Sequence, residues 1–387
     1  MAMARTLVLR VALVLLGVAA PLLLLEVALR QFGPIVPGNY ETGVWAEGHP
    51  VVGHYHIPGA RAWVREPEFT TYLRFNQFGL RGPEIAPDKS VYAQRALVLG
   101  DSFLEAKQVA EHESLAHRLQ ASLRERSAGP TELLNSGTFD WSQVHQFLYL
   151  QHAGPTFRPD IVVQFFYIGN DIGDAWPRSR GELRNLERPV ATVDDDGHLR
   201  FPEWRRRQAE PREQFFGELS RTSTVIRAYE TGVLDKLRYA ERDGHGIEGQ
   251  MLEIFRHKES VPESRAWKTV EALLVATRNE AERQGARYAL VIVPGKWQVH
   301  QKDWQSLLAA QDEVDDDRWV LRGPNRKLTQ LAELHGMTVL DLLPSLRRAA
   351  ASGRRLYYPV DIHWNADGHE VASQAVAEFL TANGLVR

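Results

Sequence analysis

The stretch Ala96-Leu-Val-Leu-Gly-Asp-Ser-Phe103 decides the fold. Four apolar residues end at Gly100-Asp101, and Ser102 follows directly. A short apolar run closed by turn residues predicts a buried strand, and Asp101 is expected to act as a turn or helix-capping residue. Side chains that follow such a strand lie at the carboxyl edge of a parallel sheet, where ligands bind in folds of this kind. The stretch therefore predicts a serine hydroxyl at the functional edge of a sheet.

Strands and helices alternate from this point to the end of the chain. Further apolar runs predict strands at 133–135, 161–168, 288–293 and 338–340, and amphipathic stretches predict helices near 115–123, 144–152, 267–284, 325–335 and after residue 366. The strands are apolar on both faces, which is typical of a parallel sheet covered by helices on both sides. The sequence thus predicts a doubly wound α/β layer.

The first thirty residues predict a membrane segment. Arg5 and Arg10 come first, and an apolar run follows from Val11 to Leu25 and extends to residue 29. Because no small-x-small cleavage site follows, an uncleaved signal anchor is favoured over a removed signal peptide or a buried core helix. Residues 6–29 would then attach the chain to the membrane, and the basic N-terminus favours a catalytic domain on the periplasmic or extracytoplasmic side.

Composition excludes several classes of function. The chain has 387 residues, a formal net charge of -3 and no cysteine. It lacks the broad basic footprint that nucleic-acid binding needs, and it cannot use thiolate chemistry or a disulfide framework. No glycine-rich phosphate loop is present, so no cofactor is predicted. No metal is predicted either, since His54 and His56 are interpreted as polar strand surface.

The organisation predicted from these patterns has three parts. Residues 1–31 form the anchor, 32–90 a lead-in of loops and strands, and 91–387 the catalytic domain. An insertion at about 172–262 interrupts that domain and is interpreted as a lid or substrate platform. Within it, residues 190–201 predict a hairpin that turns at Asp196-Gly197, so the run of three aspartates there is interpreted as part of a turn and not as a metal site.

Two further motifs carry chemistry. Gly169-Asn170-Asp171 ends the strand at 161–168, where an Asn170 amide could stabilise a developing oxyanion. Near the C-terminus, Asp361 and His363 are two residues apart in a predicted loop. A histidine activates a serine when a carboxylate fixes its tautomer and supports its charge. We therefore predict a triad of Ser102, His363 and Asp361, with His369 as the less favoured base because it falls in the first turn of a helix.

These motifs, in the order Ser, Asn and Asp/His, resemble the SGNH/GDSL hydrolase superfamily in its bacterial membrane-anchored branch, from about Phe69 to the end less the insertion. The resemblance implies a flavodoxin-like three-layer α/β/α sandwich with a mainly parallel five-stranded sheet. It also implies that Ser102 attacks an ester carbonyl, and that the oxyanion hole uses the Ser102 amide, a glycine amide and the Asn170 side chain.

The chain departs from this family pattern at two places. Proteins of this family have a glycine a few residues after the second strand. Counted from Asn135, that position holds Asp140 in this chain, and the available glycine, Gly137, comes earlier. Either amide is a candidate donor. The Asp-x-His-Trp spacing that ends at Trp364 is similar to that of proteins that O-acetylate exopolysaccharides such as alginate. The stretch 291–299 is also similar to a segment of that group. Its Lys296 is expected at the solvated surface, with a contribution of charge near the site as the alternative.

The predicted function is ester hydrolysis or acyl transfer on an extracytoplasmic acylated substrate, through an acyl-Ser102 intermediate. O-acetyl groups of a polysaccharide are the favoured target. Tryptophans at strand ends could stack on sugars: Trp141 and Trp364 are the candidate substrate contacts, with Trp176 and Trp297 as further possibilities. The alternatives are a lipase or thioesterase, and a non-catalytic polysaccharide-binding or assembly protein that retains the fold.

Overall fold

The computed structural model describes residues 2–32, 45–86, 88–89, 94–126, 129–175, 188–204, 223, 225, 252–257, 261–310 and 317–386. The chain divides into two compact units. One contains residues 1–44, 65–67 and 208–244, and the other contains residues 45–64, 68–207 and 245–387. Trp176 and most of the predicted insertion at 172–262 lie outside the described residues. The interpretation of the insertion as a lid or substrate platform therefore stays a prediction.

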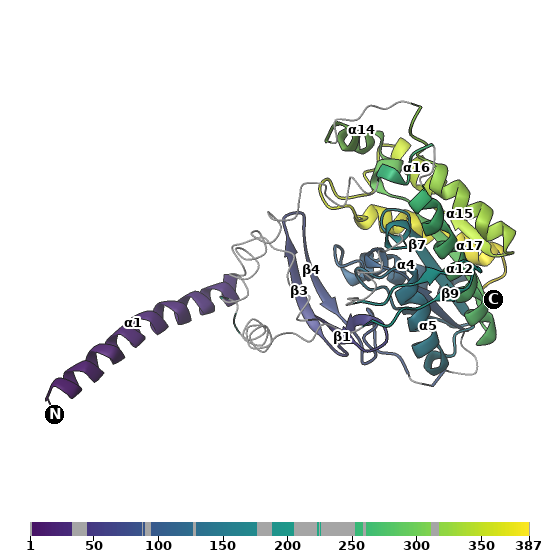
Figure 1. Cartoon of the computed structure of the whole chain (residues 1–387). Helices are drawn as coiled ribbons and strands as arrows, with labels where there is room; N and C mark the ends of the chain where they lie inside the picture. The colour runs from purple at the N-terminus through teal and green to yellow at the C-terminus, as the bar shows by residue number, and fades with distance from the viewer. Residues whose placement is uncertain are drawn as a thin grey trace. The chain divides into compact units, whose positions relative to one another are not determined.

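A five-stranded parallel sheet forms the centre of the larger unit (Figure 1). Its spatial order is β11-β10-β7-β5-β6. The strands are β5 (Gln94–Leu99), β6 (Thr131–Asn135), β7 (Ile161–Tyr167), β10 (Arg287–Val293) and β11 (Thr338–Asp341). Numbered along the chain, this is the 2-1-3-4-5 order of a flavodoxin-like fold, in which the chain reverses direction across the sheet between β5 and β7. The predicted fold class is confirmed.

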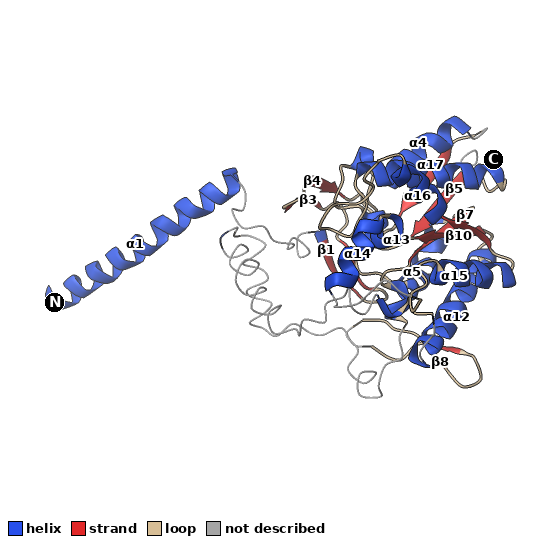
Figure 2. Cartoon of the chain, turned by 90° about the horizontal axis from the view of Figure 1, so that it is seen from above, coloured by secondary structure: helices blue, strands red, loops and turns tan. Residues whose placement is uncertain are grey.

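Helices cover both faces of this sheet (Figure 2). Alternate side chains of β7 enter different cores: Val162 and Phe166 join one apolar cluster, and Val163 and Phe165 join the other. The first cluster includes residues of α5 (Gln143–Phe157), α12 (Val261–Arg283) and α15 (Gly323–Leu334), and the second includes residues of α4 (Leu115–Arg126), α16 (Leu343–Ala351) and α17 (Ala366–Ala382). Burial of this apolar area is the main force that holds the three layers together.

Smaller elements surround the sheet. Three antiparallel hairpins pair β1 (Ala46–His49) with β2 (Gly53–His56), β3 (Arg61–Glu66) with β4 (Phe69–Arg74), and β8 (Thr192–Val193) with β9 (Leu199–Arg200). The short helices are α3 (Ser102–Glu105), η1 (Glu111–Glu113), α6 (Asp171–Asp174) and α13 (Lys296–Val299), and α14 (Gln301–Ala310) is longer. The hairpin predicted at 190–201 is confirmed, with Gly197 at φ +84° in its turn.

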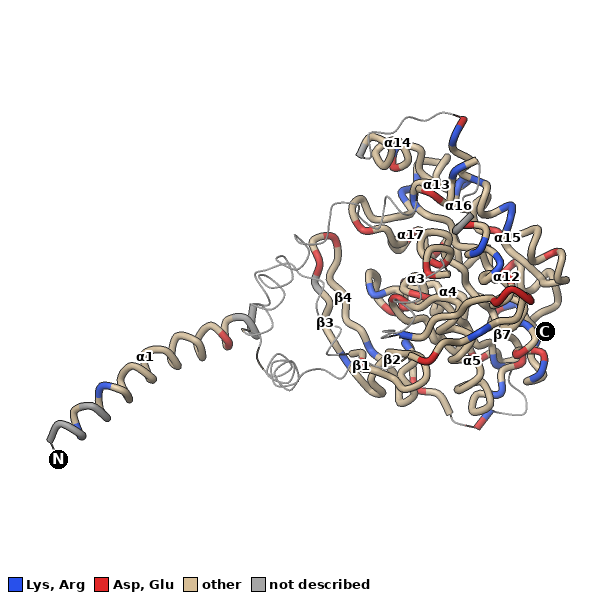
Figure 3. The backbone as a smooth tube through the Cα atoms, in the orientation of Figure 1, with Lys and Arg blue, Asp and Glu red and all other residues tan. Residues whose placement is uncertain are grey.

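The smaller unit contains one long helix, α1 (Ala2–Phe32). Its segment Leu9–Ala28 is long and apolar enough to cross a membrane, and Figure 3 shows how sparse its charged residues are. Between Arg10 and Glu26 the sequence has no Lys, Arg, Asp or Glu. Such a helix fits a membrane anchor or a signal sequence.

A buried glutamine interrupts the apolar central strand β7. Gln164 is fully buried, and its side chain donates to Gln146 Oε1 of α5 at 2.8 Å and accepts from the Tyr288 hydroxyl of β10 at 2.6 Å. A buried amide needs such partners, because an unsatisfied polar group in a core costs about 1–3 kcal/mol. The polar chain therefore fixes α5 and β10 against β7, the strand that leads into Asn170.

We expect Tyr288→Phe to lower the free energy of unfolding by about 1–3 kcal/mol, because it leaves Gln164 Oε1 without its donor. The measurement is the shift in the urea unfolding midpoint, followed by near-UV circular dichroism. Tyr72→Phe is the matched control, since Tyr72 is 41% exposed. Equal midpoints for the two variants would contradict the role given to this bond.

Candidate active site

Ser102, His363 and Asp361 form one hydrogen-bonded chain at the carboxyl edge of the sheet. Ser102 Oγ lies 2.7 Å from His363 Nε2, and His363 Nδ1 lies 2.6 Å from Asp361 Oδ1. The same carboxylate oxygen accepts the His363 backbone N–H at 2.8 Å. With Nδ1 facing a carboxylate, the imidazole carries its proton there, which leaves Nε2 free to accept the serine proton. The geometry is that of a nucleophile, a base and an orienting carboxylate.

Local charge keeps the Asp361 carboxylate ionised. Burial opposes ionisation, but the positive charge that His363 can carry and the two hydrogen bonds from His363 outweigh it and lower the pKa of Asp361 to about 2. An ionised carboxylate can hold the tautomer of the imidazole and stabilise the imidazolium that forms when serine loses its proton.

Two glycines allow α3 to carry Ser102 close to the sheet edge. A Cβ on Gly100 would lie 2.8 Å from the Leu104 side chain, and a Cβ on Gly137 would lie 2.3 Å from Leu104 Cβ and 2.7 Å from the Glu105 nitrogen. Asp101 caps this helix, as predicted, by accepting the Phe103 N–H at 2.9 Å. Gly137 is thus required for packing, whatever its amide does.

A buried polar network, which was not predicted from the sequence, binds the C-terminal end of α3. Glu105 accepts from the Trp45 indole at 3.2 Å, and its carboxylate lies 3.1 Å from His56 Nε2. Arg81 donates to the carbonyls of Glu105 and Ala106, and also to that of Val109 at 2.7 Å. The interpretation of His56 as polar surface is wrong, because His56 is 1% exposed. Its burial follows from the partner carboxylate, which lies 49 residues away in the chain.

Two more carboxyl groups lie among the buried residues around Ser102. Burial raises the pKa of Asp101 to about 6, although the Phe103 amide and His363 favour its ionised form. Burial, and then the nearby Asp101, raise the pKa of Asp171 well above its ordinary value. Asp171 Oδ2 accepts the Tyr167 N–H at 2.7 Å, so this group holds the end of β7. Neither carboxyl contacts His363 in the way that Asp361 does.

The residues predicted for the oxyanion hole differ in the hydrogen bonds and ion pairs that they already make. The Gly137 N–H donates to Asn135 Oδ1 at 3.1 Å. Asp140 has φ +57°, the left-handed conformation that favours glycine, which agrees with its place in the family pattern. Its exposed carboxylate pairs with Arg188 at 3.2 Å. Among the described residues, the buried Asn170 Oδ1 has no hydrogen-bond partner.

The structure corrects several other predictions about the surroundings of the site. Trp141 and Trp364 are both 0% exposed and Trp297 is 2% exposed, so their ring faces are packed in the core and cannot stack on a sugar. Lys296 is not a solvated surface residue: it is 9% exposed and donates to the carbonyls of Pro359 and Val360 at 3.2 and 3.0 Å. The secondary role predicted for His369 agrees with its burial and with its acceptance of the Leu115 N–H at 3.2 Å.

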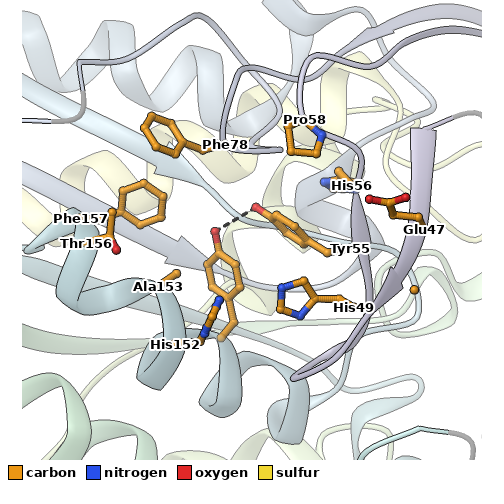
Figure 4. Close-up of a pocket in the computed structure, with 12 residues that line it drawn as sticks. Glu47, His49, Tyr55, His56, Pro58, Phe78, His152, Ala153, Thr156 and Phe157 are labelled. Carbon is orange, nitrogen blue, oxygen red and sulfur yellow. Dashed lines mark hydrogen bonds between the residues drawn. The ribbon is translucent and has the colours of Figure 1, made fainter. Parts of the chain in front are cut away.

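A pocket of about 360 Å³ lies apart from the triad (Figure 4). It opens between the β1–β2 hairpin and the C-terminal half of α5, and the hydroxyls of Tyr55 and Tyr149 meet within it at 2.9 Å. Neither Ser102 nor His363 lines it. The pocket therefore takes no direct part in chemistry at Ser102.

One cluster of side chains among the described residues could hold a metal ion. Ligand atoms of Asp194, Asp196 and His198 lie within 4.8 Å of one another. Asp194 already accepts the His198 N–H at 2.8 Å and pairs with Arg200 at 2.7 Å, as expected of a hairpin turn. These contacts account for the cluster as turn structure.

The fold and this site are similar to those of an SGNH hydrolase-like domain. Residues 247–386 match the family model described as the SGNH hydrolase-like domain of the acetyltransferase AlgX. The match includes Asp361 and His363 and agrees with the resemblance predicted from the sequence. No curated protein matches the chain.

The solved structures that the chain matches include an esterase and a lipase/acylhydrolase. An Axe2 variant, an acetyl-xylooligosaccharide esterase from Geobacillus Stearmophilus, is 10% identical with a TM-score of 0.40, over 74% of this chain and 94% of that one. The lipase/acylhydrolase from Enterococcus faecalis is 11% identical with a TM-score of 0.38, over 75% and 96%. At such values neither neighbour says anything about the chemistry of this chain.

We expect Gly137→Ala to lower the free energy of unfolding by about 1–3 kcal/mol, because the new methyl group overlaps the backbone of α3. It should also displace Ser102 and reduce its reactivity toward a fluorophosphonate probe. Gly173→Ala is the control, since a Cβ at Gly173 in α6 meets nothing within 4 Å. Wild-type stability and labelling in Gly137→Ala would contradict the close packing described above.

Proposed function

We propose that the chain performs serine-dependent ester chemistry through a covalent acyl-Ser102 intermediate. The observation that carries the proposal is the continuous chain of hydrogen bonds from Ser102 Oγ through His363 to Asp361. His363 takes the Ser102 proton as the hydroxyl attacks the ester carbonyl, and it then returns that proton to the departing alcohol. Water or a second alcohol next attacks the acyl group and regenerates Ser102.

The oxyanion that forms in this reaction needs donors at the same edge of the sheet. We propose the Ser102 N–H, the Asn170 side-chain amide and one N–H of the loop after β6, either that of Gly137 or that of Asp140. Asp140 is favoured for the last role because the Gly137 N–H already has an acceptor, and because Arg188 offsets the negative charge that would otherwise oppose an oxyanion.

The substrate class proposed is an extracytoplasmic acylated polysaccharide, with O-acetyl groups as the acyl unit. Support comes from the match of residues 247–386 to an acetyltransferase family model and from the apolar helix Leu9–Ala28. As an uncleaved anchor, that helix would hold the catalytic unit at the outer side of the membrane. A non-catalytic binding protein is disfavoured, because binding alone does not require a serine, a histidine and a carboxylate in hydrogen-bonded order.

The test uses the full-length protein in detergent micelles with p-nitrophenyl acetate, with and without a bare oligosaccharide. Nitrophenol release and sugar mass are both followed. Turnover in water alone supports an esterase, whereas release that accelerates as the sugar gains acetyl mass supports a transferase. Ser102→Ala should reduce either signal to the background rate because the nucleophile is lost. Equal rates for wild type and Ser102→Ala would contradict the proposal and favour a binding protein.

Asp361→Asn should reduce kcat by about 10⁴-fold, as a carboxamide in the orienting position of a serine triad does by favouring the wrong imidazole tautomer. KM for the ester should change little, since Asp361 is proposed to act on His363 and not on the substrate. Steady-state kinetics between pH 6 and pH 9 measure both constants. Asp367→Asn is the control, because it also removes one nearby carboxylate, which pairs with Arg354 at 2.9 Å. A loss of kcat equal to that of the control would exclude Asp361 from the triad.

A further inference from the structure

The loop Pro359–His363 carries two of the three proposed triad residues without forming a helix or strand. Its second residue, Val360, is 79% exposed, so burial of that side chain contributes little to the position of the loop. Ile362 of the same loop is partly buried and packs against both apolar clusters, but this contact lies after Val360 and Asp361. The backbone before Ile362 needs further contacts, since a shift of about 1 Å in a catalytic group can reduce turnover by about 100-fold.

A carboxylate from the β3–β4 hairpin holds the N–H groups of this loop. Glu68 Oε1 accepts the Val360 N–H at 2.9 Å, and Glu68 Oε2 accepts the Asp361 N–H at 2.6 Å. Both oxygens of one carboxylate thus bind consecutive amides. Hydrogen bonds to an ionised acceptor are shorter and about twice as strong as neutral ones, and two parallel bonds also fix direction.

A cation holds the carbonyl groups of the same loop. Lys296 Nζ donates to the carbonyls of Pro359, Val360 and Asp361 at 3.2, 3.0 and 3.5 Å. The negative side chain therefore takes the N–H groups and the positive side chain takes the C=O groups. This pairing defines the orientation of the peptide planes that join Pro359 to Val360 and Val360 to Asp361.

The hairpin that supplies Glu68 is itself packed next to the loop. Phe69 is 8% exposed and its ring centroid lies 5.4 Å from that of Tyr358. The Tyr358 hydroxyl donates to the Gln108 carbonyl at 2.9 Å, and the Tyr358 N–H donates to the His363 carbonyl at 3.1 Å. Glu68 is therefore presented from an anchored strand end.

We propose that Glu68 is a positioning residue, which holds Asp361 and His363 in reach of Ser102 by binding the backbone of their loop. The inference rests on the function proposed above. It assigns a role in catalysis to the hairpin at residues 61–74, which lies outside the segment that matches the acetyltransferase model. Glu68 touches no atom of the triad side chains in these contacts and acts only through the loop.

The test compares Glu68→Gln, Glu68→Ala and Glu68→Asp in the full-length protein with p-nitrophenyl acetate. Glutamine keeps the size but offers one acceptor oxygen and turns an NH₂ group toward the second amide. We expect kcat to fall by about 10- to 100-fold in the glutamine and alanine variants with KM unchanged, and to recover in part in the aspartate variant, which keeps both acceptors. Glu84→Gln is the matched control, since Glu84 also accepts one backbone N–H, from Gln77 at 3.0 Å.

Hydrogen exchange followed by mass spectrometry separates this inference from the proposed function. In the wild type, the amides of Val360 and Asp361 should exchange slowly, and Glu68→Ala should expose them while amides of β10 stay protected. This exchange result is expected even if Ser102 proves unreactive. In that case the proposed function is wrong, but Glu68 still holds the backbone of the loop. Wild-type kcat in Glu68→Ala, or unchanged exchange at residues 360 and 361, would overturn the positioning role.

Discussion

The hydrogen bond between Ser102 and His363 is the constraint on which the site depends, because it joins groups 261 residues apart in the chain. Neither local sequence nor a single element can set its 2.7 Å length. The sheet edge and α3 must fix the serine, and a loop without regular structure must fix the histidine. The two halves meet only when the three layers are packed, so the site is a product of the whole tertiary structure.

The two halves use different physical means. Ser102 is fixed mainly by close packing, since Gly100 and Gly137 leave room for Leu104 where any side chain would collide with it. His363 is fixed mainly by charge, through Asp361, Glu68 and Lys296. Close packing holds the serine rigidly, whereas charged contacts orient the backbone of a partly solvated loop, beside the apolar contacts of Ile362.

The sequence predicted those parts of the structure that depend on local pattern. The five strands, their parallel arrangement and the main helices follow from apolar periodicity and turn residues, and the Ser, Asn and Asp/His motifs follow strands or precede a helix. Contacts between distant segments could not be predicted in this way. His56 was interpreted as surface because its partner Glu105 lies 49 residues further on, and Lys296 because its carbonyl partners lie 63 or more residues away. For Trp141 and Trp364, position at a strand end gave no information on burial, since a ring there can turn either into the core or toward solvent.

The lead-in before β5 has a larger part in the site than its composition of loops and short strands indicates. Trp45 and His56 bind the Glu105 side chain, Arg81 binds carbonyls at the end of α3, and Glu68 binds the loop of Asp361. These contacts reach both halves of the proposed triad. Because the same segment follows α1 in the chain, a membrane anchor would be connected to the catalytic unit through the residues that hold its active site together.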